Sequence, residues 1–525
     1  MEVNPLNIFF VKSDSKGDRL LFRYPYTTEN KDENKQKNSG RQNPYAINTT
    51  TEELLQNPQS QTSNISKGQL SGFTDEMLST LFAVKAELCN RKFELKVNDV
   101  RFVGHPTLLP YRTSQGENSA TILINIVFAL QASASHSIVK CYYDLSKRLG
   151  KALRHEEKRS TTFTLDYWLD RPKSAFHLIL QRSSLARSMK AVFEELSSTG
   201  IVQVRINKYV LLSFCLPHKA HQIHNKGLTI EPETIDKCIQ KLRPYHGILL
   251  MVNPNDLLMS IPLDGSAALL RLIKLYSPLK SLQTMAIEAD LTLPQVFQLT
   301  GHLVYWAKAT VIYPLCEGNV YVVAPGAAVH THSPLCEEFM ARPADHINVI
   351  HQLLSEFSLP APLWYAWRGR GAAGGARLAR AVAWLLRRRL LLQLHTYVQF
   401  NSHWGQDPGE WACFSHSFWF TNSLYTGYIG IINIKHILWP TFKCKNNYIS
   451  TSGATAPPTG MRAEKLLIKT VFLHTGYFRG EQHLEEIMFM ENVTRSQLMQ
   501  LLDKFKDILI TFETEDPAVA MLYPY

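Results

Sequence analysis

The chain has 525 residues, of which 45% are hydrophobic, and this predicts roughly three or four domains with apolar cores. A formal net charge of +11 would favour nucleic acid or an acidic membrane surface as a partner, but arginines concentrated at 367–389, a segment without acidic residues, supply much of that charge. The eight cysteines form no CxxC pair and no Cys/His cluster with zinc spacing, which excludes a zinc finger and favours a reduced, intracellular compartment.

The N-terminal segment predicts two strands, and no signal peptide is expected because no basic region precedes an apolar stretch. The strands are residues 6–11 and 19–26 (RLLFRYPY), joined by a turn. Residues 27–72 are rich in Asn, Gln, Ser, Thr and Lys, so they are predicted to be a disordered insertion. A helix is expected at 74–89, with Thr74 as its N-cap. The side chains expected to face inward from this helix are Met77, Leu81, Phe82 and Leu88.

A β-hairpin is predicted next, because the segment FELKV alternates apolar and charged residues with the period of a strand. The Asn-Asp pair at 98–99 supplies a two-residue turn. The resulting register places Leu95 opposite Phe102 on the apolar side of the hairpin. On the other side it places Glu94 diagonal to Arg101, a favourable cross-strand pair.

The hairpin is followed by a nearly continuous apolar run at 121–130, typical of a central strand covered on both faces. A helix at 138–159 comes next. Its inward side chains are expected to be Ile138, Tyr142, Leu145, Leu149 and Leu153. The order strand, strand, helix, strand, strand, strand, helix resembles the longin arrangement, an antiparallel sheet with helices packed against it. Residues 1–160 are therefore predicted to be a longin-like domain.

Residues 161–233 are interpreted as a connecting region, with an amphipathic helix at 184–198 and a pair of strands at 201–214. His218, His221 and His224 recur at intervals of three residues and are the types of side chain that bind metals. No carboxylate or cysteine joins them. They are predicted to lie in a solvated loop, and the sequence predicts no metal site and no cofactor.

Residues 234–400 and 466–525 contain an internal repeat. LTLPQVFQL at 291–299 and VTRSQLMQL at 493–501 share a threonine and a glutamine with the spacing of a capping box. Each is preceded by a predicted helix, at 282–289 and 484–490. Each is followed by two predicted strands, at 310–314 with 320–323 and at 508–512 with 518–522. Helix, turn, helix and hairpin is the plan of a winged helix, so we expect a winged-helix-containing middle region and a C-terminal winged-helix-like domain.

Winged helices often bind DNA, but these two lack the chemistry for it. Pro294–Trp306 has no Lys or Arg, and the helix at 497–505 offers only Lys504, beside Asp503. Without basic groups to neutralise phosphates there is little affinity for DNA. A protein-contact module is the favoured interpretation.

Two segments depart from the patterns around them. Residues 363–383 change abruptly to Ala, Gly and Arg, and they are interpreted as a variable loop. Residues 401–465 are rich in aromatics without a helical or strand period and are interpreted as an irregular insertion or linker. Polar residues interrupt this second segment too often for a transmembrane helix.

No catalytic constellation is present, because the chain lacks GxxxxGK[ST], GxSxG and HExxH. A role in stimulating GTP hydrolysis would need an arginine inserted toward the γ-phosphate. Arg23 and Arg101 lie on predicted strands, where a surface or cross-strand role is expected. Arg368 and Arg370 lie in the atypical segment. No residue is assigned a catalytic role, and no enzyme activity is expected of this chain.

Several long blocks resemble the nitrogen permease regulator 3-like family, in order along most of the chain. The blocks are RLLFRYPY, FELKVNDVRFVGHPTLL, LRPYHGILL, VFQLTGHLVYWAKATVIYPLCEGNVYVV, RRRLLLQLHTYV and FRGEQHLEEIMFMENVTRSQLMQLLDKF.

The resemblance implies a scaffold subunit of the GATOR complex, which activates GTP hydrolysis by Rag GTPases and restrains the TOR kinase when amino acids are scarce. It also implies a regulator 2-like partner, a DEP-domain partner, and a cytoplasmic protein recruited to the lysosomal surface. In that complex the catalytic arginine is associated with the regulator 2-like partner. The alternative is a winged-helix nucleic-acid-binding regulator.

Overall fold

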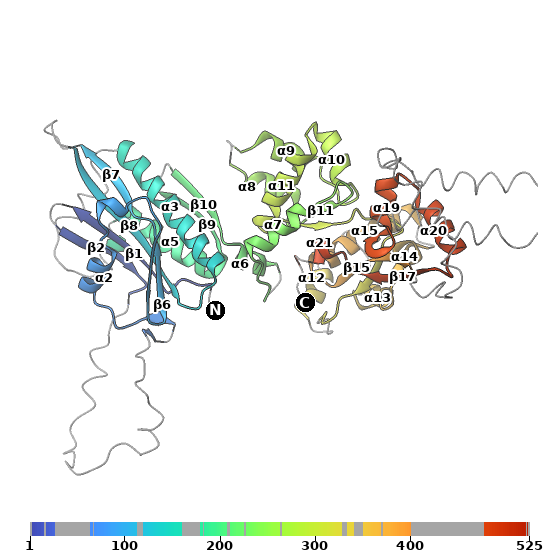
Figure 1. Ribbon diagram of the computed structural model, residues 1–525, viewed down its shortest axis with the longest axis horizontal. Coiled ribbons are helices and arrows are strands. Elements are labelled where there is room, and N and C mark those ends of the chain that lie inside the picture. Colours follow the sequence, from blue (N-terminus) through green and yellow to red (C-terminus); the bar gives the residue numbers. More distant parts are fainter. Residues whose placement is uncertain are drawn as a thin grey trace, which may run out of the picture. The chain divides into compact units, whose positions relative to one another are not determined.

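The computed structural model describes a large part of the chain: residues 3–14, 17–26, 64–66, 68–112, 119–159, 179–181, 183–206, 210–224, 227–262, 265–327, 333–340, 350–368, 371–400, 477–520 and 522. It divides into two compact units (Figure 1). The first unit is Met1–Thr234 with Tyr305–Ala307, and the second is Ile235–Val304 with Lys308–Tyr525. The predicted insertion at 401–465 lies outside the described residues.

The first unit is built on an antiparallel sheet, followed by a second, smaller one. Its elements are β1 (Asn7–Asp14), β2 (Gly17–Tyr24), β3 (Ile65–Ser66), β4 (Gln69–Leu70), α2 (Asp75–Phe82), β5 (Phe93–Val97), β6 (Val100–Gly104), β7 (Thr107–Arg112), β8 (Ser119–Gln131), α3 (His136–Arg159), α5 (Ser184–Ser198), β9 (Ile201–Ile206), β10 (Val210–Cys215) and α6 (Pro217–Ala220). The main sheet has the order β2-β1-β8-β6-β5, and β7 also pairs with β8. The fold is therefore a mixed α+β one with antiparallel sheets, as predicted.

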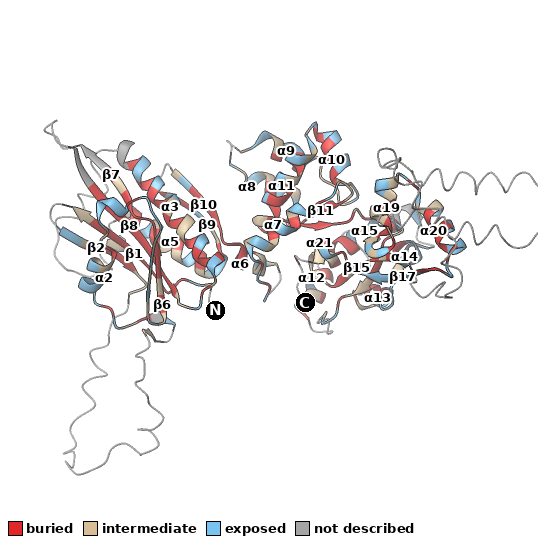
Figure 2. Cartoon of the chain, viewed as in Figure 1, coloured by how far each residue is buried: buried red, intermediate tan, exposed pale blue. Residues whose placement is uncertain are grey.

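Strand β8 lies at the centre of this sheet, and most of its described residues are buried (Figure 2). On one face Ile126 and Phe128 pack in a core with α3, and on the other Val127 and Ala129 pack in a second core with α2. Gly150 allows α3 to approach the sheet closely, because a Cβ there would lie 2.3 Å from Thr107 Oγ1. The prediction of a doubly covered central strand is confirmed.

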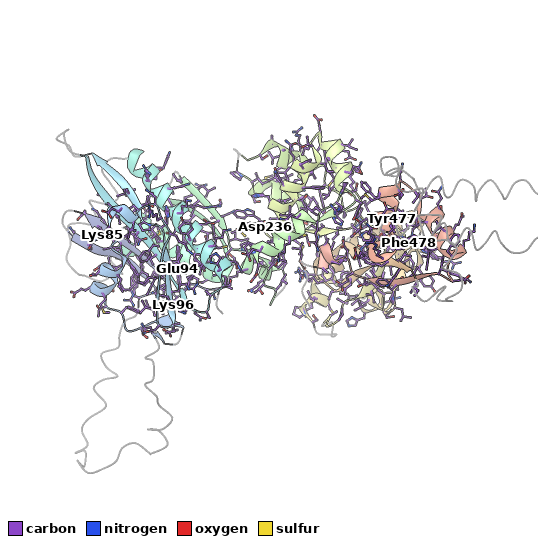
Figure 3. The ribbon with its side chains drawn as sticks, in the orientation of Figure 1. Lys85, Glu94, Lys96, Asp236, Tyr477 and Phe478 are labelled. Atoms are coloured by element: carbon purple, nitrogen blue, oxygen red, sulfur yellow. The ribbon has the colours of Figure 1, made fainter. Side chains whose placement is uncertain are left out.

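The β5–β6 hairpin has the predicted register. Leu95 pairs with Phe102, and Asn98 in the turn has a φ of 51°, which asparagine tolerates better than most residues. Glu94 Oε1 lies 3.4 Å from Arg101 Nη1, so the diagonal ion pair is present. Lys96 is exposed on β5 beyond Glu94 (Figure 3). The hairpin thus has one apolar and one charged side.

Two predictions for the first unit need correction. Helix α2 begins as expected after Thr74, whose hydroxyl accepts from Met77 N, but it ends at Phe82 instead of continuing to 89. Met77 and Leu88 are about half exposed, and Leu78 is buried beside Phe82. The helix ends because Ala83 adopts an extended conformation.

The predicted disordered insertion at 27–72 lies mostly outside the described residues. Its last part is described and forms the small β3–β4 hairpin, in which Leu70 is fully buried. Leu70 packs in the core that α2 covers, and this gives the segment a reason to fold.

The predicted connecting region contributes to the core of the first unit. Helix α5 is capped by Ser183, and its buried side chains Leu185, Met189 and Val192 belong to the same core as α3. Strands β9 and β10 pair with each other and contribute further to that core.

The second unit alternates helices with short strands. Its elements are α7 (which begins in the first unit, Pro232–Gln240), β11 (Gly247–Leu250), α8 (Pro254–Ser260), α9 (Ala267–Lys274), α10 (Leu282–Ala289), α11 (Leu293–Tyr305), β12 (Ala309–Ile312), β13 (Val320–Val323), α12 (Pro334–Met340), α13 (Ile350–Ser355), β14 (Ala361–Pro362), α14 (Leu363–Trp367), α15 (Gly371–Arg387), β15 (Leu391–Phe400), β16 (Arg479–His483), α19 (Leu484–Glu491), α20 (Arg495–Lys504), β17 (Leu509–Thr514) and α21 (Pro517–Ala520). Strand β15 organises the larger sheet, because β13, β16 and β17 all pair with it.

Both predicted helix-turn-helix pairs are present, as α10–α11 and α19–α20. At Thr494 both hydrogen bonds of the capping box are formed. At Thr292 the glutamine arm is formed, with Gln295 Oε1 accepting from Thr292 N at 3.1 Å.

The predicted hairpins after these helices do not form. Strand β12 pairs with β11, whereas β13 pairs with β14 and β15. The segment predicted as the last strand, 518–522, instead begins in helix α21. Strands β12 and β13 therefore pair with strands that are distant in sequence and not with each other.

The Ala- and Arg-rich segment at 363–383 is not a loop, contrary to the prediction. It forms α14 and most of α15, and Leu378, Val382 and Leu385 of α15 are buried at helical spacing. Alanine and arginine have high helix propensity, so the unusual composition still encodes an amphipathic helix. Within the described residues, no helix is both long enough and apolar enough to cross a membrane.

Candidate functional site

A group of buried and half-buried polar side chains lies in the second unit, beside the start of β11, the ends of β12 and β16 and the middle of β15. We call it the histidine cluster. It consists of His246, Tyr313, His395, His483, Glu485, Arg495 and Asp516. Its three histidines are between 1% and 3% exposed, which is unusual for groups that water solvates well.

Strand pairing brings these residues together from distant parts of the sequence. His246 and Tyr313 flank the paired residues Gly247 and Ile312 of β11 and β12. His395 lies on β15, and His483 ends β16 opposite Tyr397 of the same strand. Glu485 and Arg495 lie near the starts of α19 and α20, and Asp516 precedes α21.

The hydrogen bonds of His483 fix its tautomer. Its Nδ1 accepts from Glu486 N at 3.1 Å, which caps α19. The proton of the neutral imidazole therefore lies on Nε2, which is 2.7 Å from Tyr313 Oη. Tyr313 in turn donates to Asp516 Oδ2 at 2.7 Å. A relay of hydrogen bonds thus runs from the start of α19 to the start of α21.

Asp516 is the anion at the end of this relay. Its Oδ1 accepts from Ala518 N, and its Oδ2 lies 3.4 Å from His246 Nε2. Burial would raise the pKa of Asp516, but hydrogen bonds from His246, Ala518 N and Tyr313 hold it well below its usual range. Burial lowers the pKa of His246, although the Asp516 carboxylate opposes this effect. Burial and the same carboxylate raise the pKa of Tyr313.

Glu485 is a second anion of the cluster and is half-buried. Arg495 Nη1 donates to its Oε1 at 2.9 Å. Its Oε2 lies 3.3 Å from His395 Nδ1 and 3.2 Å from His483 Nδ1. Burial would raise the pKa of Glu485, but the two neighbouring imidazoles hold it well below its usual range. The carboxylate is therefore ionised between two imidazole rings.

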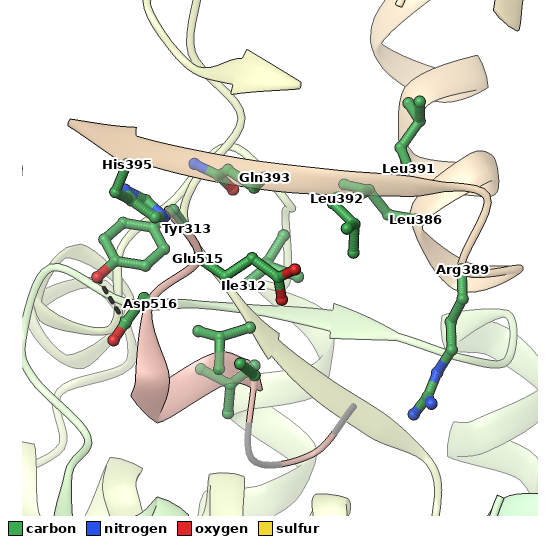
Figure 4. A pocket seen from close by; sticks show the side chains of 13 residues that line it. Ile312, Tyr313, Leu386, Arg389, Leu391, Leu392, Gln393, His395, Glu515 and Asp516 are labelled. Atoms are coloured by element: carbon green, nitrogen blue, oxygen red, sulfur yellow. Dashed lines mark hydrogen bonds between the residues drawn. The ribbon is translucent and has the colours of Figure 1, made fainter. Parts of the chain in front are cut away.

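A small pocket opens beside the histidine cluster (Figure 4). His395, Tyr313 and Asp516 line one end of it, and Arg389 lies at the opposite end. The remaining wall is mainly aliphatic and is supplied by β12, the end of α15, the start of β15 and α21. The cluster is therefore buried in the fold but lies close to a surface opening.

The three histidines at 218–224 are placed differently from the prediction of a solvated loop. His218 lies on α6, His221 begins the short 3-10 helix His221–Ile223, and His224 follows that helix. His218 is 3% exposed, and its Nε2 lies 2.9 Å from Ser137 Oγ on α3. His224 Nε2 lies 2.8 Å from Ala307 O. The loop prediction was wrong because these residues close the end of the core of the first unit.

His218 makes the stability of the first unit depend on pH. Burial lowers its pKa to about 4, from 6.5. Between these values the unfolded chain takes up a proton that the folded chain does not. Stability should therefore be fully present above pH 6.5 and should fall by roughly 3 kcal/mol as the pH decreases toward 4.

Chemical denaturation at a series of pH values measures this effect. His218→Gln should flatten the decline in that pH range, and His136→Gln, at an exposed histidine next to Ser137, is the matched control. Equal slopes for wild type and His218→Gln would show that this imidazole does not cause the decline.

Of the arginines considered for catalysis, Arg23 and Arg101 make structural contacts within the first unit. Arg23 is 8% exposed, and its Nη1 lies 3.0 Å from Asp75 Oδ1 on α2. Arg101 pairs with Glu94 and donates to Ala132 O. Arg368 is exposed at the end of α14, and Arg370 lies outside the described residues.

The histidine cluster was not predicted from the sequence. His395, His483 and Glu485 lie in blocks recognised only by their resemblance, and no motif joins positions so far apart. Two signals were present: a histidine inside the apolar strand LLQLHTYV, and the His-x-Glu spacing at 483–485. Neither identifies a site without the pairing of β15 and β16.

Comparison with known proteins identifies the family. Residues 72–162 and 125–401 match the family described as nitrogen permease regulator of amino acid transport activity 3. Residues 471–510 match the C-terminal helix-turn-helix of the GATOR1 complex protein NPRL3, which here is the α19–α20 pair.

Individual relatives align with this chain over most of its length. The chain is 41% identical to the GATOR complex protein NPRL3 of Drosophila melanogaster, over 99% of both chains. It is 26% identical to the protein of that name from Caenorhabditis elegans, over 84% of this chain and 83% of the relative. It is 20% identical to nitrogen permease regulator 3 of Candida albicans, over 63% of this chain and 55% of that protein. The chain therefore belongs to the nitrogen permease regulator 3 (NPR3/NPRL3) family.

Proposed function

We propose that this chain is a non-catalytic scaffold subunit of a GATOR complex that stimulates GTP hydrolysis by Rag GTPases. The observation that carries this proposal is the match over 99% of both chains to a relative named as a GATOR complex protein. An alignment of that extent includes both units, so the proposal applies to the whole chain. Under this proposal the complex restrains TOR signalling during amino-acid starvation, and it acts in the cytoplasm and at the lysosomal surface.

The first unit supports a role in pairing with another subunit. We propose that its main sheet, with α2 on one face and α3 on the other, is a longin-like domain and that it binds the regulator 2-like subunit. The order of strands and helices fits this fold, and β2 and β5 end the chain of paired strands in the sheet. An edge strand has unpaired backbone groups and can extend a sheet into a partner. The DEP-domain subunit is proposed as the other stable partner.

The placement of the arginines supports a non-catalytic role. An arginine finger must reach the γ-phosphate from a surface that can contact the nucleotide. Arg23 and Arg101 instead form ion pairs with carboxylates of their own unit. We propose that this chain contributes geometry to the complex and that a partner contributes the catalytic arginine.

Single alanine substitutions test this division of labour. An arginine finger is worth about 10³–10⁵ in rate, so a catalytic arginine would be obvious. Arg23→Ala, Arg101→Ala, Arg368→Ala and Arg370→Ala should each change Rag GTP hydrolysis by the assembled complex less than tenfold. Size-exclusion chromatography must accompany each rate, because Arg101 also bonds to the backbone of Ala132. A thousandfold loss in an intact complex would make this subunit the catalyst.

Nucleic-acid binding is the weaker alternative. Among the described residues, helix α11 has no Lys or Arg, and on α20 Arg495 is bound to Glu485. Lys504 lies over the ring of Phe505, 5.3 Å from its centroid. These helices offer few cations for phosphate contacts, so electrostatic attraction to a duplex is weak.

A further inference from the structure

We propose that His395, His483 and Glu485 form a binding site for a divalent transition metal ion, and that Zn²⁺ is the ion it suits best. This inference is independent of the proposed place of the chain in a GATOR complex. Three observations support it: the distances between the donor atoms, the hydrogen bond that orients His483, and the charge of the half-buried Glu485 carboxylate.

Two of the three distances between donor atoms are those that tetrahedral zinc requires. Glu485 Oε2 lies 3.3 Å from His395 Nδ1 and 3.2 Å from His483 Nδ1. A zinc ion about 2.0–2.1 Å from each ligand atom in tetrahedral geometry needs ligand atoms about 3.3 Å apart. Each of the three residues offers one ligand atom, and these atoms all lie within 4.8 Å of one another. Binding therefore requires only small side-chain movements.

The imidazole of His483 is oriented as a metal ligand. Its Nε2 donates to Tyr313 Oη, and Tyr313 donates to Asp516, so an imidazole N–H is held by a relay that ends in a carboxylate. Histidines that bind metals commonly have their second nitrogen held in this way. Nδ1 of His483 lies 3.2 Å from Glu485 Oε2, so an ion bound to that carboxylate oxygen is within reach of this nitrogen.

A bound metal ion would have to displace one hydrogen bond of His483. Glu486 N donates to the same Nδ1 of His483 at 3.1 Å. A bound ion takes the place of this hydrogen bond at the start of α19. Metal binding is thereby coupled to the conformation of the first turn of the C-terminal helix-turn-helix.

The charges and the donor types also favour a metal. Arg495 occupies Oε1 of Glu485 and leaves Oε2 for another cation. Two imidazoles and one carboxylate are a donor set that zinc uses, with a water molecule in the fourth position. Of the three ligands, His395 lines the pocket of Figure 4. The ion would join β15 to the end of β16 and the start of α19.

Metal analysis of the purified full-length chain tests the proposal. The protein is loaded with Zn²⁺, passed over a chelating resin that removes weakly bound ions, and its zinc content is measured by mass spectrometry. Wild type should retain one equivalent more than His395→Gln and one more than Glu485→Gln. Tyr313→Phe should weaken binding by about 10–100-fold, because it removes the hydroxyl that orients His483 and leaves the three ligands in place. His105→Gln, at a buried histidine of the first unit, is the matched control and should retain the ion.

Co²⁺ gives a second measurement that needs no variant. Cobalt bound by nitrogen and oxygen ligands in tetrahedral geometry absorbs strongly in the visible, without the near-ultraviolet band of a thiolate ligand. Wild type should show this spectrum at one equivalent of Co²⁺ and lose it on addition of Zn²⁺. Wild type that retains no metal, or variants that retain as much as wild type, would show that the cluster is held by hydrogen bonds alone. A thiolate spectrum would also overturn the proposal.

Discussion

Replacing Phe102 with alanine should lower the free energy of unfolding of the first unit by about 3–5 kcal/mol. Phe102 is fully buried, and its ring centroid lies 5.0 Å from that of Phe82 and 5.5 Å from that of Phe73. Phe9, on β1, is 6.3 Å away on the same face of the sheet. Removal of the ring leaves a cavity among three aromatic side chains from β1, α2 and the segment before α2. These groups cannot all move inward, so the cost should lie at the high end for a core substitution.

The neighbouring arginine provides the control. Arg101 lies on the other side of the hairpin, where it pairs with Glu94 and donates to Ala132 O. Arg101→Ala should cost no more than about 1 kcal/mol, because the pair is partly solvated. Thermal or denaturant melts of both variants, followed with a probe in the first unit, make the comparison. A larger loss for Arg101→Ala than for Phe102→Ala would contradict this assignment of the two sides.

The hairpin also shows what the sequence alone can predict. Its register follows from local information, because a two-residue turn leaves one pairing that keeps Leu95 and Phe102 on the apolar side. The inward face of α3 and the capping box at Thr494 are local patterns of the same kind, and both are confirmed. Where residues close in sequence determine the structure, the local sequence pattern was sufficient to predict it.

Pairing between distant segments was not predictable in this way. Strand β13 is four residues long, and nothing in VYVV specifies that it pairs with β15 instead of β12. The histidine cluster could not be predicted for the same reason, because it depends on the pairing of β15 with β16, which are distant in sequence. Helix α15 was missed for another reason. Its composition was unlike that of the surrounding sequence, and this obscured an apolar stripe of ordinary helical period.

Deleting the first unit should abolish association with the regulator 2-like subunit. The deletion should end at residue 234, because α5 packs in the same core as α3. A deletion that ended at residue 160 would leave Leu185 and Val192 of α5 uncovered, and misfolding would then imitate a loss of binding. A fragment of residues 1–234 is the matched control and should keep the partner if the longin-like sheet provides the interface. Full recovery of the regulator 2-like subunit with the deleted chain would place the interface in the second unit.

Affinity purification of the tagged full-length chain from cells, with the associated proteins identified by mass spectrometry, tests most directly whether the chain is a subunit of a GATOR complex. We expect the regulator 2-like and DEP-domain subunits to be recovered in amounts comparable to the chain itself, and nuclease treatment and added salt should not remove them. Recovery of nucleic acid that is lost as salt increases, without these two subunits, would show that the chain is a nucleic-acid-binding protein instead.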